Sequence, residues 1–214
     1  MSLWSEILNH RGRLIHKLKH YIPAYEAHFG RYVNRPLTFL EIGCGQGGSL
    51  QVWKRYFGPH AQIIGIDIEP GCAAFAEDQV AVRIGDQSDP MFLSAVLDEF
   101  GPPHIVLDDG SHMKEHMAAS FNFLYPRMAP EGVYMIEDLQ TAYWPEYGGG
   151  LRQRGSFVEL CKDLLDELNA DLSHGAVDPT DFTRNTQSMH FYGGIAVFER
   201  GRTPEKGPLI VPPP

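Results

Sequence analysis

Short apolar runs alternate with segments of helical spacing through the middle of this chain, and this rhythm constrains the fold more than any other feature. Strands that alternate with helices form a parallel sheet covered on both faces. The predicted strands are Leu37–Ile42, Ala61–Ile68, Val80–Ile84, Pro103–Leu107 and Gly132–Glu137. The predicted helices between and after them are Leu50–Phe57, Cys72–Glu77, Pro90–Phe100 and Met113–Met128.

The two ends of the chain depart from this rhythm. Residues 3–29 have the apolar spacing of one or two amphipathic helices broken near Pro23, which predicts a helical cover over residues 1–30. Residues 141–155 form a loop rich in Gly, Tyr and Trp, and Phe157–Leu172 is a predicted helix. Met189–Glu199 predicts a late strand, broken at its glycine pair, that closes the sheet. The Pro212–Pro214 run predicts a frayed end.

The length and composition suit one globular domain over residues 1–214, because 43% of the residues are hydrophobic and 21% are charged. No run approaches the eighteen or so apolar residues that a membrane helix needs, so we expect no membrane partner. The start of the chain lacks the pattern of a signal peptide. Cys44, Cys72 and Cys161 show no CxxC spacing, which favours reduced thiols and a cytoplasmic protein.

The net charge of −9 is unevenly distributed. Residues 1–55 hold 8 Lys and Arg against 3 acidic residues, whereas the remainder holds 10 against 24. This acidic body argues against nucleic acid as a partner and leaves room for a cation or a small ligand. We interpret the basic N-terminal stretch as a solvated helix face. Because that stretch is amphipathic, we also expect a homo-oligomer whose partner surface covers it.

A glycine-rich loop follows the first predicted strand. Gly43, Gly45 and Gly48 satisfy the pattern GxGxxG, and a helix is predicted directly after them. Asp67 ends the second strand, 19 residues after Gly48, where a carboxylate can accept both hydroxyls of a ribose. Glycines let the backbone turn tightly and approach a ligand at a helix N-terminus. The spacing therefore predicts a binding site for a nucleoside-containing cofactor. We expect a Rossmann-like, doubly wound α/β fold with seven mostly parallel strands and helices on both faces.

Two cofactors fit this loop, NAD and S-adenosylmethionine (SAM). Glu41 lies two residues before Gly43, where a carboxylate suits an ammonium and a sulfonium better than a pyrophosphate. Asp86 and Gln87 follow the third strand, where a side chain can accept a hydrogen bond from the adenine amino group. The alternative for Asp86 is a helix cap before Pro90. Asp108, at the end of the fourth strand, completes the set of predicted cofactor contacts.

Two pairs of acids end neighbouring strands. Asp108 and Asp109 end the fourth strand, shortly before His112, and Glu137 and Asp138 end the fifth. These carboxylates repel one another unless a positive charge joins them, and a hard divalent cation such as Mg²⁺ binds carboxylate oxygens well. The pattern thus predicts a metal site at the carboxyl edge of the sheet. The alternative is that Asp109 caps a helix and the second pair merely ends a strand.

Two further sequence patterns lie near the predicted metal site. The run from His112 to His116 matches HxxEH, a zinc-protease pattern, but no separate third ligand is evident. The loop over residues 141–155 carries Tyr143, Trp144 and Tyr147 at the mouth of the predicted site. Aromatic side chains in such a position line a sugar or polyketide face, or else pack on one another.

Taken together, these motifs resemble the Rossmann-like SAM-dependent methyltransferases over residues 30–200. The matching segments begin at Glu41, Gly65, Gly85 and Val106. The resemblance implies that Gly43 and Gly45 carry the methionine end of SAM. It further implies that Asp67 holds the ribose and Asp86 meets the adenine.

The acidic segments and the aromatic loop resemble the metal-dependent sugar O-methyltransferases of macrolide tailoring, the mycinamicin type, and the cephalosporin-hydroxylase-like proteins. The resemblance implies Mg²⁺ ligands at Asp109, Glu137 and Asp138 and a catalytic base at His112. The function implied is SAM- and Mg²⁺-dependent methylation of a sugar hydroxyl in a natural-product glycoside or a polysaccharide. A catechol-type O-methyltransferase, an oxygenase component and a non-catalytic SAM-binding module are the alternatives.

Overall fold

The computed structural model describes residues 2–202 and 206–211, so the prediction for Pro212–Pro214 lies outside the described residues. In that part of the chain, seven strands form one sheet in the order β3-β2-β1-β4-β5-β7-β6. Five strands are parallel: β1 (Leu37–Ile42), β2 (Ala61–Asp67), β3 (Val80–Ile84), β4 (Ile105–Asp108) and β5 (Val133–Ile136). The antiparallel strands are β6 (Thr186–Tyr192) and β7 (Ile195–Arg200). The predicted seven-stranded, mostly parallel α/β fold is therefore confirmed.

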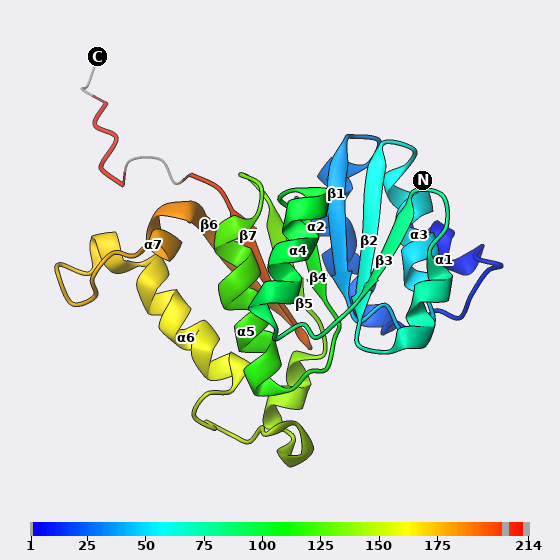
Figure 1. Cartoon of the computed structure of the whole chain (residues 1–214). Coiled ribbons are helices and arrows are strands. Elements are labelled where there is room, and N and C mark those ends of the chain that lie inside the picture. Colours follow the sequence, from blue (N-terminus) through cyan, green and yellow to red (C-terminus); the bar gives the residue numbers. More distant parts are fainter. Residues whose placement is uncertain (1, 203–205, 212–214) are drawn as a thin grey trace.

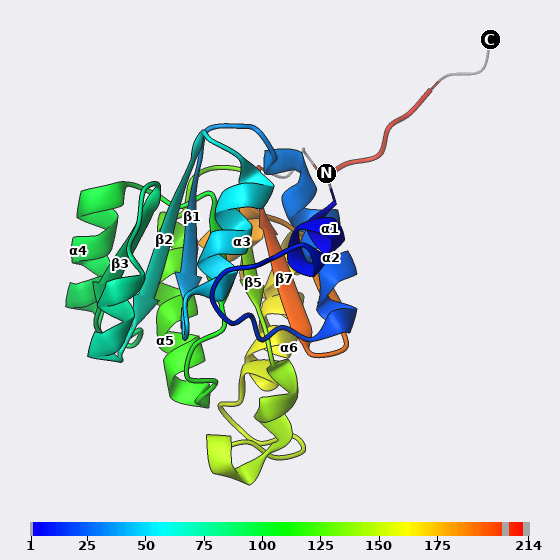
Figure 2. The same ribbon diagram turned by 90° about the vertical axis from the view of Figure 1, so that its right-hand side faces the viewer.

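Helices cover both faces of the sheet (Figure 1, Figure 2). One face carries α1 (Leu3–Leu8), α2 (Ile22–Phe29) and α3 (Gly48–Phe57), and the other carries α4 (Pro90–Phe100), α5 (Lys114–Leu124) and α6 (Phe157–Leu168), with the short α7 (Asp181–Asn185) after it. Successive strand residues point to opposite faces. In β1, Phe39 therefore packs beside α2 and α3, whereas Leu40 packs on the opposite face. Across residues 2–202 and 206–211, we find no helix with the length and apolar character to cross a membrane.

The late part of the sheet differs from the prediction. A single broken strand over Met189–Glu199 is wrong, because β6 and β7 are separate antiparallel strands joined at Gly193 and Gly194. Gly194 has φ +80°, and a glycine of positive φ permits the tight turn of a hairpin. Strand β7 lies between β5 and β6, so the hairpin extends the sheet on its β5 side.

The N-terminal stretch is not a continuous helical cover. Residues 9–18, which we call the strap, have no helical structure and link α1 to a 3₁₀ turn at Lys19–Tyr21. Pro23 does not break a helix but lies in the first turn of α2, where its missing N–H costs nothing. The strap crosses the N-terminal end of α3 and the ends of the central strands (Figure 2). The predicted break therefore falls about ten residues too late in the chain.

The topology opens a crevice beside β1. From β1 the chain builds outward to β2 and β3 on one side, and β4 and β5 extend the sheet on the other. The helical connections that follow β1 and β4 consequently lie on opposite faces of the sheet, and ligands bind at the carboxyl edge beside such a point in open α/β sheets. The glycine loop and both acidic pairs follow strands at this edge.

Candidate functional site

The glycine loop is pressed against the loop that follows β4. Gly43 has φ +80°, a conformation that side chains disfavour, and a Cβ at this position would collide with the backbone carbonyl of Asp109. Gly48, at the start of α3, is covered instead by the strap, because a Cβ there would collide with the carbonyls of Arg13 and Leu14. The glycines therefore allow two other segments to approach the end of β1.

Two cavities meet at this loop and share Gly43, Gly45 and Asp109 in their walls. The larger, of about 290 Å³, runs along the ends of β2 and β3 past Asp67 and Asp86. The smaller, of about 240 Å³, lies under the strap. Together they form an elongated hollow centred on the glycine loop.

Asp67 is held in place by backbone donors. Its Oδ2 accepts a hydrogen bond of 2.9 Å from the amide of Gly45, and its Oδ1 accepts one of 3.0 Å from the amide of Glu69. The side chain thereby joins the glycine loop to the end of β2 along the wall of the larger cavity. Its position suits the predicted contact with a ribose.

Asp86 and Gln87, which follow β3, make different hydrogen bonds. The Oδ1 of Asp86 accepts hydrogen bonds of 2.7 Å from the backbone N–H and the hydroxyl of Ser88, and these bonds lower the pKa of Asp86. The helix-cap alternative for Asp86 is wrong, because Asp89 caps α4 by accepting from the amide of Met91. Gln87 lines the larger cavity and accepts a hydrogen bond of 2.8 Å from the amide of Ser111.

Asp108 and Glu41, both predicted to contact the cofactor, line neither cavity. Asp108 is 1% exposed and accepts hydrogen bonds from Ser120 and Tyr134. Burial raises the pKa of Asp108, although those hydrogen bonds oppose the shift. Glu41 is fully buried and accepts a hydrogen bond of 2.7 Å from Ser49. The structure places these carboxylates beneath the crevice.

Three carboxylates converge on the face of the sheet that carries α2 and α3. Glu41 belongs to β1, Asp109 follows β4 and Glu137 follows β5, and these three strands are neighbours. All three acids have odd residue numbers, as do the core residues that β1, β4 and β5 direct to this face. Because side chains alternate between the two faces of a strand, the three acids lie on the same face. Asp108 is one residue before Asp109, so its side chain points into the core on the opposite face of the sheet.

Lys17 of the strap lies among these three carboxylates. Its Nζ is 2.6 Å from Oδ2 of Asp109, 3.0 Å from Oε1 of Glu137 and 3.1 Å from Oε1 of Glu41. Its side chain is 6% exposed. Burial alone would lower the pKa of Lys17, but the three carboxylates outweigh burial and hold its pKa well above the usual value. Our sequence analysis missed this residue, and the only signal was the basic excess of residues 1–55.

The buried Glu137 also accepts a hydrogen bond of 2.5 Å from the hydroxyl of Tyr25, a residue of α2. Burial and the charge of Asp109 raise the pKa of Glu137 to about 8, despite the opposing effect of Lys17. Burial likewise raises the pKa of Tyr25 well above its usual range. Tyr25 therefore acts as a hydrogen-bond donor to Glu137 at neutral pH.

His112 lies between the other two acids of the site. Its Nε2 is 3.7 Å from Oδ1 of Asp109 and 3.6 Å from Oδ2 of Asp138. His112 and Asp138 both have positive φ, +57° and +51°, which is uncommon outside glycine and concentrates at functional sites. The Oδ1 of Asp138 accepts hydrogen bonds of 2.7 Å from Tyr21 and 2.9 Å from Gln140. Asp138 thus has one oxygen fixed by hydrogen bonds and the other directed at His112.

This geometry suits a hard cation at Asp109 and Asp138. One oxygen of each carboxylate, together with Nε2 of His112, lies within 4.8 Å of the others. Carboxylate oxygens are the ligands that Mg²⁺ prefers. Glu137, the third predicted ligand, instead has both oxygens within 3.2 Å of the Lys17 ammonium.

The aromatic loop reaches this site through Tyr147. Its ring lies 6.2 Å from the ring of His112, and the ring of Trp144 lies 6.0 Å from that of Tyr147. Tyr143 and Trp144 are 48% and 44% exposed.

The zinc-protease alternative for His112 and His116 is not supported. His112 precedes α5, and His116 contacts the hydroxyl of Ser111 instead.

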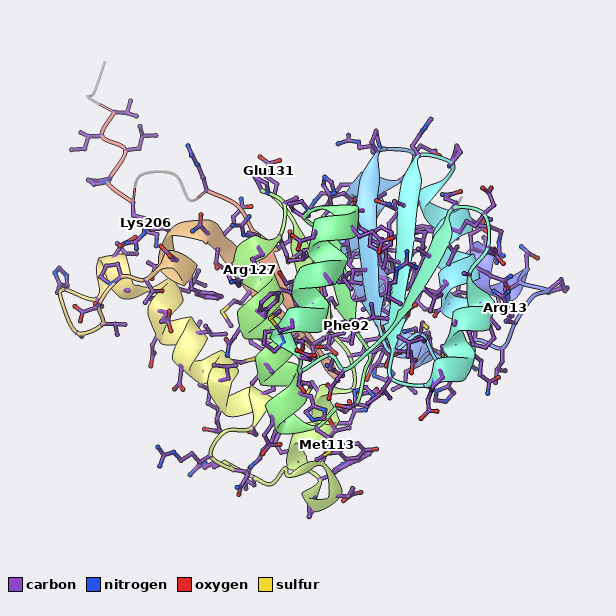
Figure 3. All side chains as sticks on the ribbon, viewed as in Figure 1. Arg13, Phe92, Met113, Arg127, Glu131 and Lys206 are labelled. Atoms are coloured by element: carbon purple, nitrogen blue, oxygen red, sulfur yellow. The ribbon has the colours of Figure 1, made fainter. Side chains whose placement is uncertain are left out.

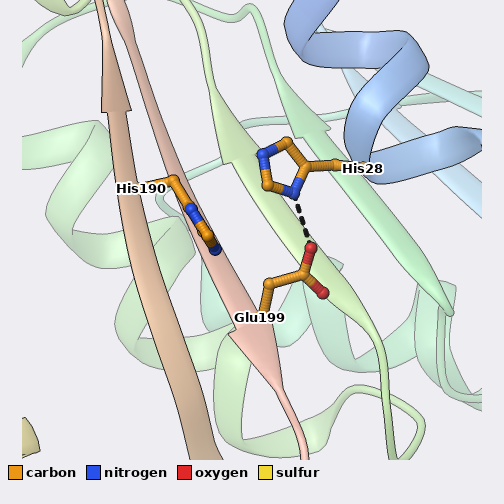
Figure 4. Close-up of side chains that lie close together, drawn as sticks. All are labelled: His28, His190 and Glu199. Carbon is orange, nitrogen blue, oxygen red and sulfur yellow. Dashed lines mark hydrogen bonds and ion pairs between the residues drawn. The ribbon is translucent and has the colours of Figure 1, made fainter.

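A second cluster of metal-binding residue types, His28, His190 and Glu199, lies where α2 meets the hairpin (Figure 4). The Nδ1 of His28 is 2.6 Å from Glu199, and its Nε2 is 3.0 Å from the hydroxyl of Tyr192. Arg31 contacts both oxygens of Glu199. These contacts occupy the potential ligand atoms of His28 and Glu199, so the cluster ties α2 to the hairpin.

A third cavity, of about 440 Å³, is connected to Asp138 through Gln140. Gln140 lines this cavity and donates a hydrogen bond to the carboxylate of Asp138. Most of its wall is apolar or aromatic and comes from α6, the aromatic loop and the hairpin. The residues are Leu139, Tyr143, Val158, Leu165, Phe191 and Tyr192.

Comparison with known proteins gives a consistent set of relatives, although no family model matches the chain. The mycinamicin VI 2''-O-methyltransferase of Micromonospora griseorubida is 39% identical over 212 residues, which cover 90% of this chain and 51% of that protein. The demethylmacrocin O-methyltransferase of Streptomyces fradiae is 38% identical, with 87% and 50% covered. This chain spans about half the length of these relatives.

A solved structure extends the similarity to three dimensions. The MycE methyltransferase of the mycinamycin pathway, in complex with Mg, S-adenosylhomocysteine (SAH) and mycinamycin VI, superposes with a TM-score of 0.81. The two chains are 36% identical, and the match covers 91% of this chain and 53% of MycE. The similarity therefore extends over most of the described fold.

Proposed function

Because this chain belongs to the Rossmann-like methyltransferases and is homologous to enzymes that methylate macrolide sugars, we propose that it transfers a methyl group from SAM to a sugar hydroxyl. The acceptor is a natural-product glycoside, and the reaction depends on a divalent cation. The observation that carries this proposal is the position of His112 between Asp109 and Asp138. Asp109 also forms part of the wall of both cavities at the glycine loop.

SAM would occupy the elongated hollow around that loop. Its methionine end would lie at Gly43 and Gly45, its ribose would contact Asp67, and its adenine would lie beside Asp86 and Gln87. The size and course of the two joined cavities support this orientation. The backbone hydrogen bonds to Asp67 also support it, because they fix a carboxylate where a ribose would need an acceptor.

Asp109, Asp138 and the third predicted ligand, Glu137, would hold the cation, which when bound would stabilise the negative charge that develops on the acceptor oxygen. The gap between the free oxygens of Asp109 and Asp138 supports this role. His112 would accept the hydroxyl proton at Nε2, because histidine is the side chain that most often acts as a general base. The two flanking carboxylates would stabilise the imidazolium. Tyr21 and Gln140 would orient Asp138 through their hydrogen bonds.

The apolar cavity beside Asp138 would take the aglycone of the acceptor. Gln140 connects the wall of this cavity to the carboxylate that faces His112, so a glycoside could place its sugar at His112 and its apolar part against Leu165 and Phe191. Phe191 is 51% exposed, and an exposed aromatic surface favours an apolar ligand. This position supports a glycoside acceptor over a free sugar.

The direct test is a methyl-transfer assay with SAM, Mg²⁺ and a panel of acceptors that includes macrolide glycosides, free sugars and catechols. We expect mass spectrometry to detect one added methyl group on a glycoside and SAH as the second product. Removal of Mg²⁺ with a chelator should stop the reaction. Transfer to catechols alone would support the catechol-type alternative, and transfer that survives the chelator would refute the cation-dependent mechanism.

The aglycone site has a separate test. Leu165→Asp introduces a charge into the wall of the apolar cavity and should raise KM for a glycoside with an apolar aglycone. The affinity for SAH should not change, because Leu165 lines neither cavity at the glycine loop. Leu172→Asp is a matched control, because Leu172 is 60% exposed and does not line the apolar cavity. Equal KM values for the two variants would refute this placement of the aglycone.

A further inference from the structure

The ammonium of Lys17 occupies the space that a shared ligand of Asp109 and Glu137 would need. Its Nζ lies 2.6 Å from Oδ2 of Asp109 and within 3.2 Å of both oxygens of Glu137. Mg²⁺ binds oxygen at about 2.1 Å. An ion held by Glu137 and by Oδ2 of Asp109 would therefore overlap the ammonium.

Asp109 and Glu137 differ in whether a carboxylate oxygen remains available to an ion. Asp109 directs Oδ2 to Lys17 and Oδ1 toward His112, so it can ligate an ion on the His112 side without moving. Glu137 has no such second side, because Lys17 contacts both of its oxygens and Tyr25 donates to one of them. Ligation by Glu137 thus requires that the ammonium leave.

The strap that carries Lys17 is held to the body of the molecule at Arg13. Arg13 lies at the edge of the molecule (Figure 3), where its guanidinium donates to the carbonyl of Phe75 at 3.1 Å and contacts Glu77 at 3.3 Å. Its amide donates to Gln51 at 3.0 Å. The chain between Arg13 and Lys17 includes Leu14 and His16, which line the smaller cavity at the glycine loop.

We propose that Lys17 is the resident cation of Asp109 and Glu137, and that a divalent cation competes with it for these two carboxylates. Binding of the ion displaces the ammonium toward solvent and so changes the wall of the smaller cavity at the glycine loop, which Lys17 itself lines. This inference rests on the cation site of the proposed function. It adds a specific competitor for that site and a route by which cation binding alters the wall of the cofactor cavity.

The affinity of Mg²⁺ alone, measured by titration calorimetry, tests the competition. In Lys17→Met the ion no longer has to displace an ammonium, so its affinity should rise about tenfold or more, the equivalent of about 1.4 kcal/mol. Lys19→Met is the matched control, because Lys19 is exposed and two residues away. An unchanged or weaker affinity in Lys17→Met would overturn the proposal.

A second measurement uses the wild-type protein and does not depend on how the variant folds. An amine-reactive label, read by mass spectrometry, should modify the buried Lys17 slowly and the exposed Lys19 rapidly without Mg²⁺. Saturating Mg²⁺ should raise labelling of Lys17 severalfold and leave that of Lys19 unchanged. Labelling of Lys17 that stays constant or falls would show that the ammonium remains in place.

Asp138→Asn separates this inference from the proposed function. Asp138 faces His112 and Tyr21 and is not in contact with Lys17. If Asp138→Asn weakens Mg²⁺ binding while Lys17→Met does not change it, the cation site stands and the competition is refuted. If neither the wild type nor Lys17→Met binds Mg²⁺, the cation site itself is refuted, whereas SAH binding still tests the cofactor site.

Discussion

The hydroxyl of Tyr25 donates a hydrogen bond of 2.5 Å to Oε1 of Glu137, and both side chains are buried. The two residues lie 112 positions apart in the sequence. This bond fixes α2 to the carboxyl end of β5 and positions the acid that Lys17 also contacts. Part of the acidic cluster is consequently held by a helix far from it in sequence.

Tyr25→Phe should destabilise the fold, because Glu137 loses a buried donor. A buried polar group that loses its hydrogen-bond partner costs about 1–3 kcal/mol, so we expect a loss in that range in urea unfolding. Tyr56→Phe is the control, because among the described residues no hydrogen bond of the Tyr56 hydroxyl is found although its side chain is 6% exposed. Equal stability of Tyr25→Phe and the wild type would show that the bond is not stabilising.

Asp67→Ala should weaken SAH binding, because a ribose would lose its acceptor and Gly45 would lose the carboxylate that accepts from its amide. Loss of a hydrogen bond with a charged partner corresponds to a decrease of about tenfold to a hundredfold in affinity, measurable by calorimetry. Glu69→Ala keeps the backbone amide that contacts Asp67 and should bind SAH normally. Tighter binding of NAD than of SAH to the wild type would contradict the cofactor assignment.

His112→Ala should lower kcat at neutral pH by about 10²–10⁴, the usual contribution of a general base. Mg²⁺ and SAH should still bind, and activity should recover in part at high pH, where hydroxide replaces the base. His174→Ala, at an exposed position remote in sequence, should retain full rate. A pH–rate profile of both variants distinguishes these outcomes, and full activity of His112→Ala at neutral pH would point to another base.

The raised pKa of Glu137 predicts a pH dependence of stability in metal-free buffer. Burial raises this pKa from 4.5 to about 8, so the folded state retains a proton that the unfolded state releases over that interval. Stability should therefore be greatest below about pH 4.5 with respect to this group, and its contribution should be lost as the pH rises to about 8. Glu137→Gln should flatten the urea-unfolding profile between these values. Glu131→Gln, an exposed control, should keep the wild-type slope.

The expected homo-oligomer can be tested at the N-terminal surface. Trp4, Leu8 and Leu14 are 40%, 60% and 63% exposed on α1 and the strap, and apolar exposure of this kind favours association. Light scattering should give a mass above that of one chain, and Leu8→Asp should lower it. Leu172→Asp adds a charge at an equally exposed position outside this surface and should leave the mass unchanged. A monomeric mass for the wild type would refute the expectation.

Much of the sheet could be predicted, because its parallel strands are continuous apolar runs. The strands β1 and β3 and the helix α4 have the bounds that the sequence predicts. The strap could not be predicted by the same means. Leu14, Ile15 and Leu18 have helical spacing, but contacts with α3 and the end of the 3₁₀ turn at Pro70–Phe75 determine its path. A local pattern cannot reveal contacts that depend on distant segments.

The acidic site was predicted only in part for a similar reason. The positions of Asp109 and Glu137 at neighbouring strand ends follow from strand order, and their shared face follows from alternation. The charge that joins them does not, because Lys17 lies 92 and 120 residues away from them in sequence. Lys17 supplies these acids with a positive partner from within the chain, and a metal ion at this site stays a prediction.

The place of β7 between β5 and β6 has a consequence for how the protein is made. During synthesis, β5 emerges before β7, so its outer edge remains unpaired until residues 195–200 have left the ribosome. The cluster of His28 and Glu199, 171 residues apart, likewise cannot form before then, although α2 is synthesised well before β7. Nascent chains that stop short of β7 therefore present an exposed strand edge, the surface on which aggregation begins.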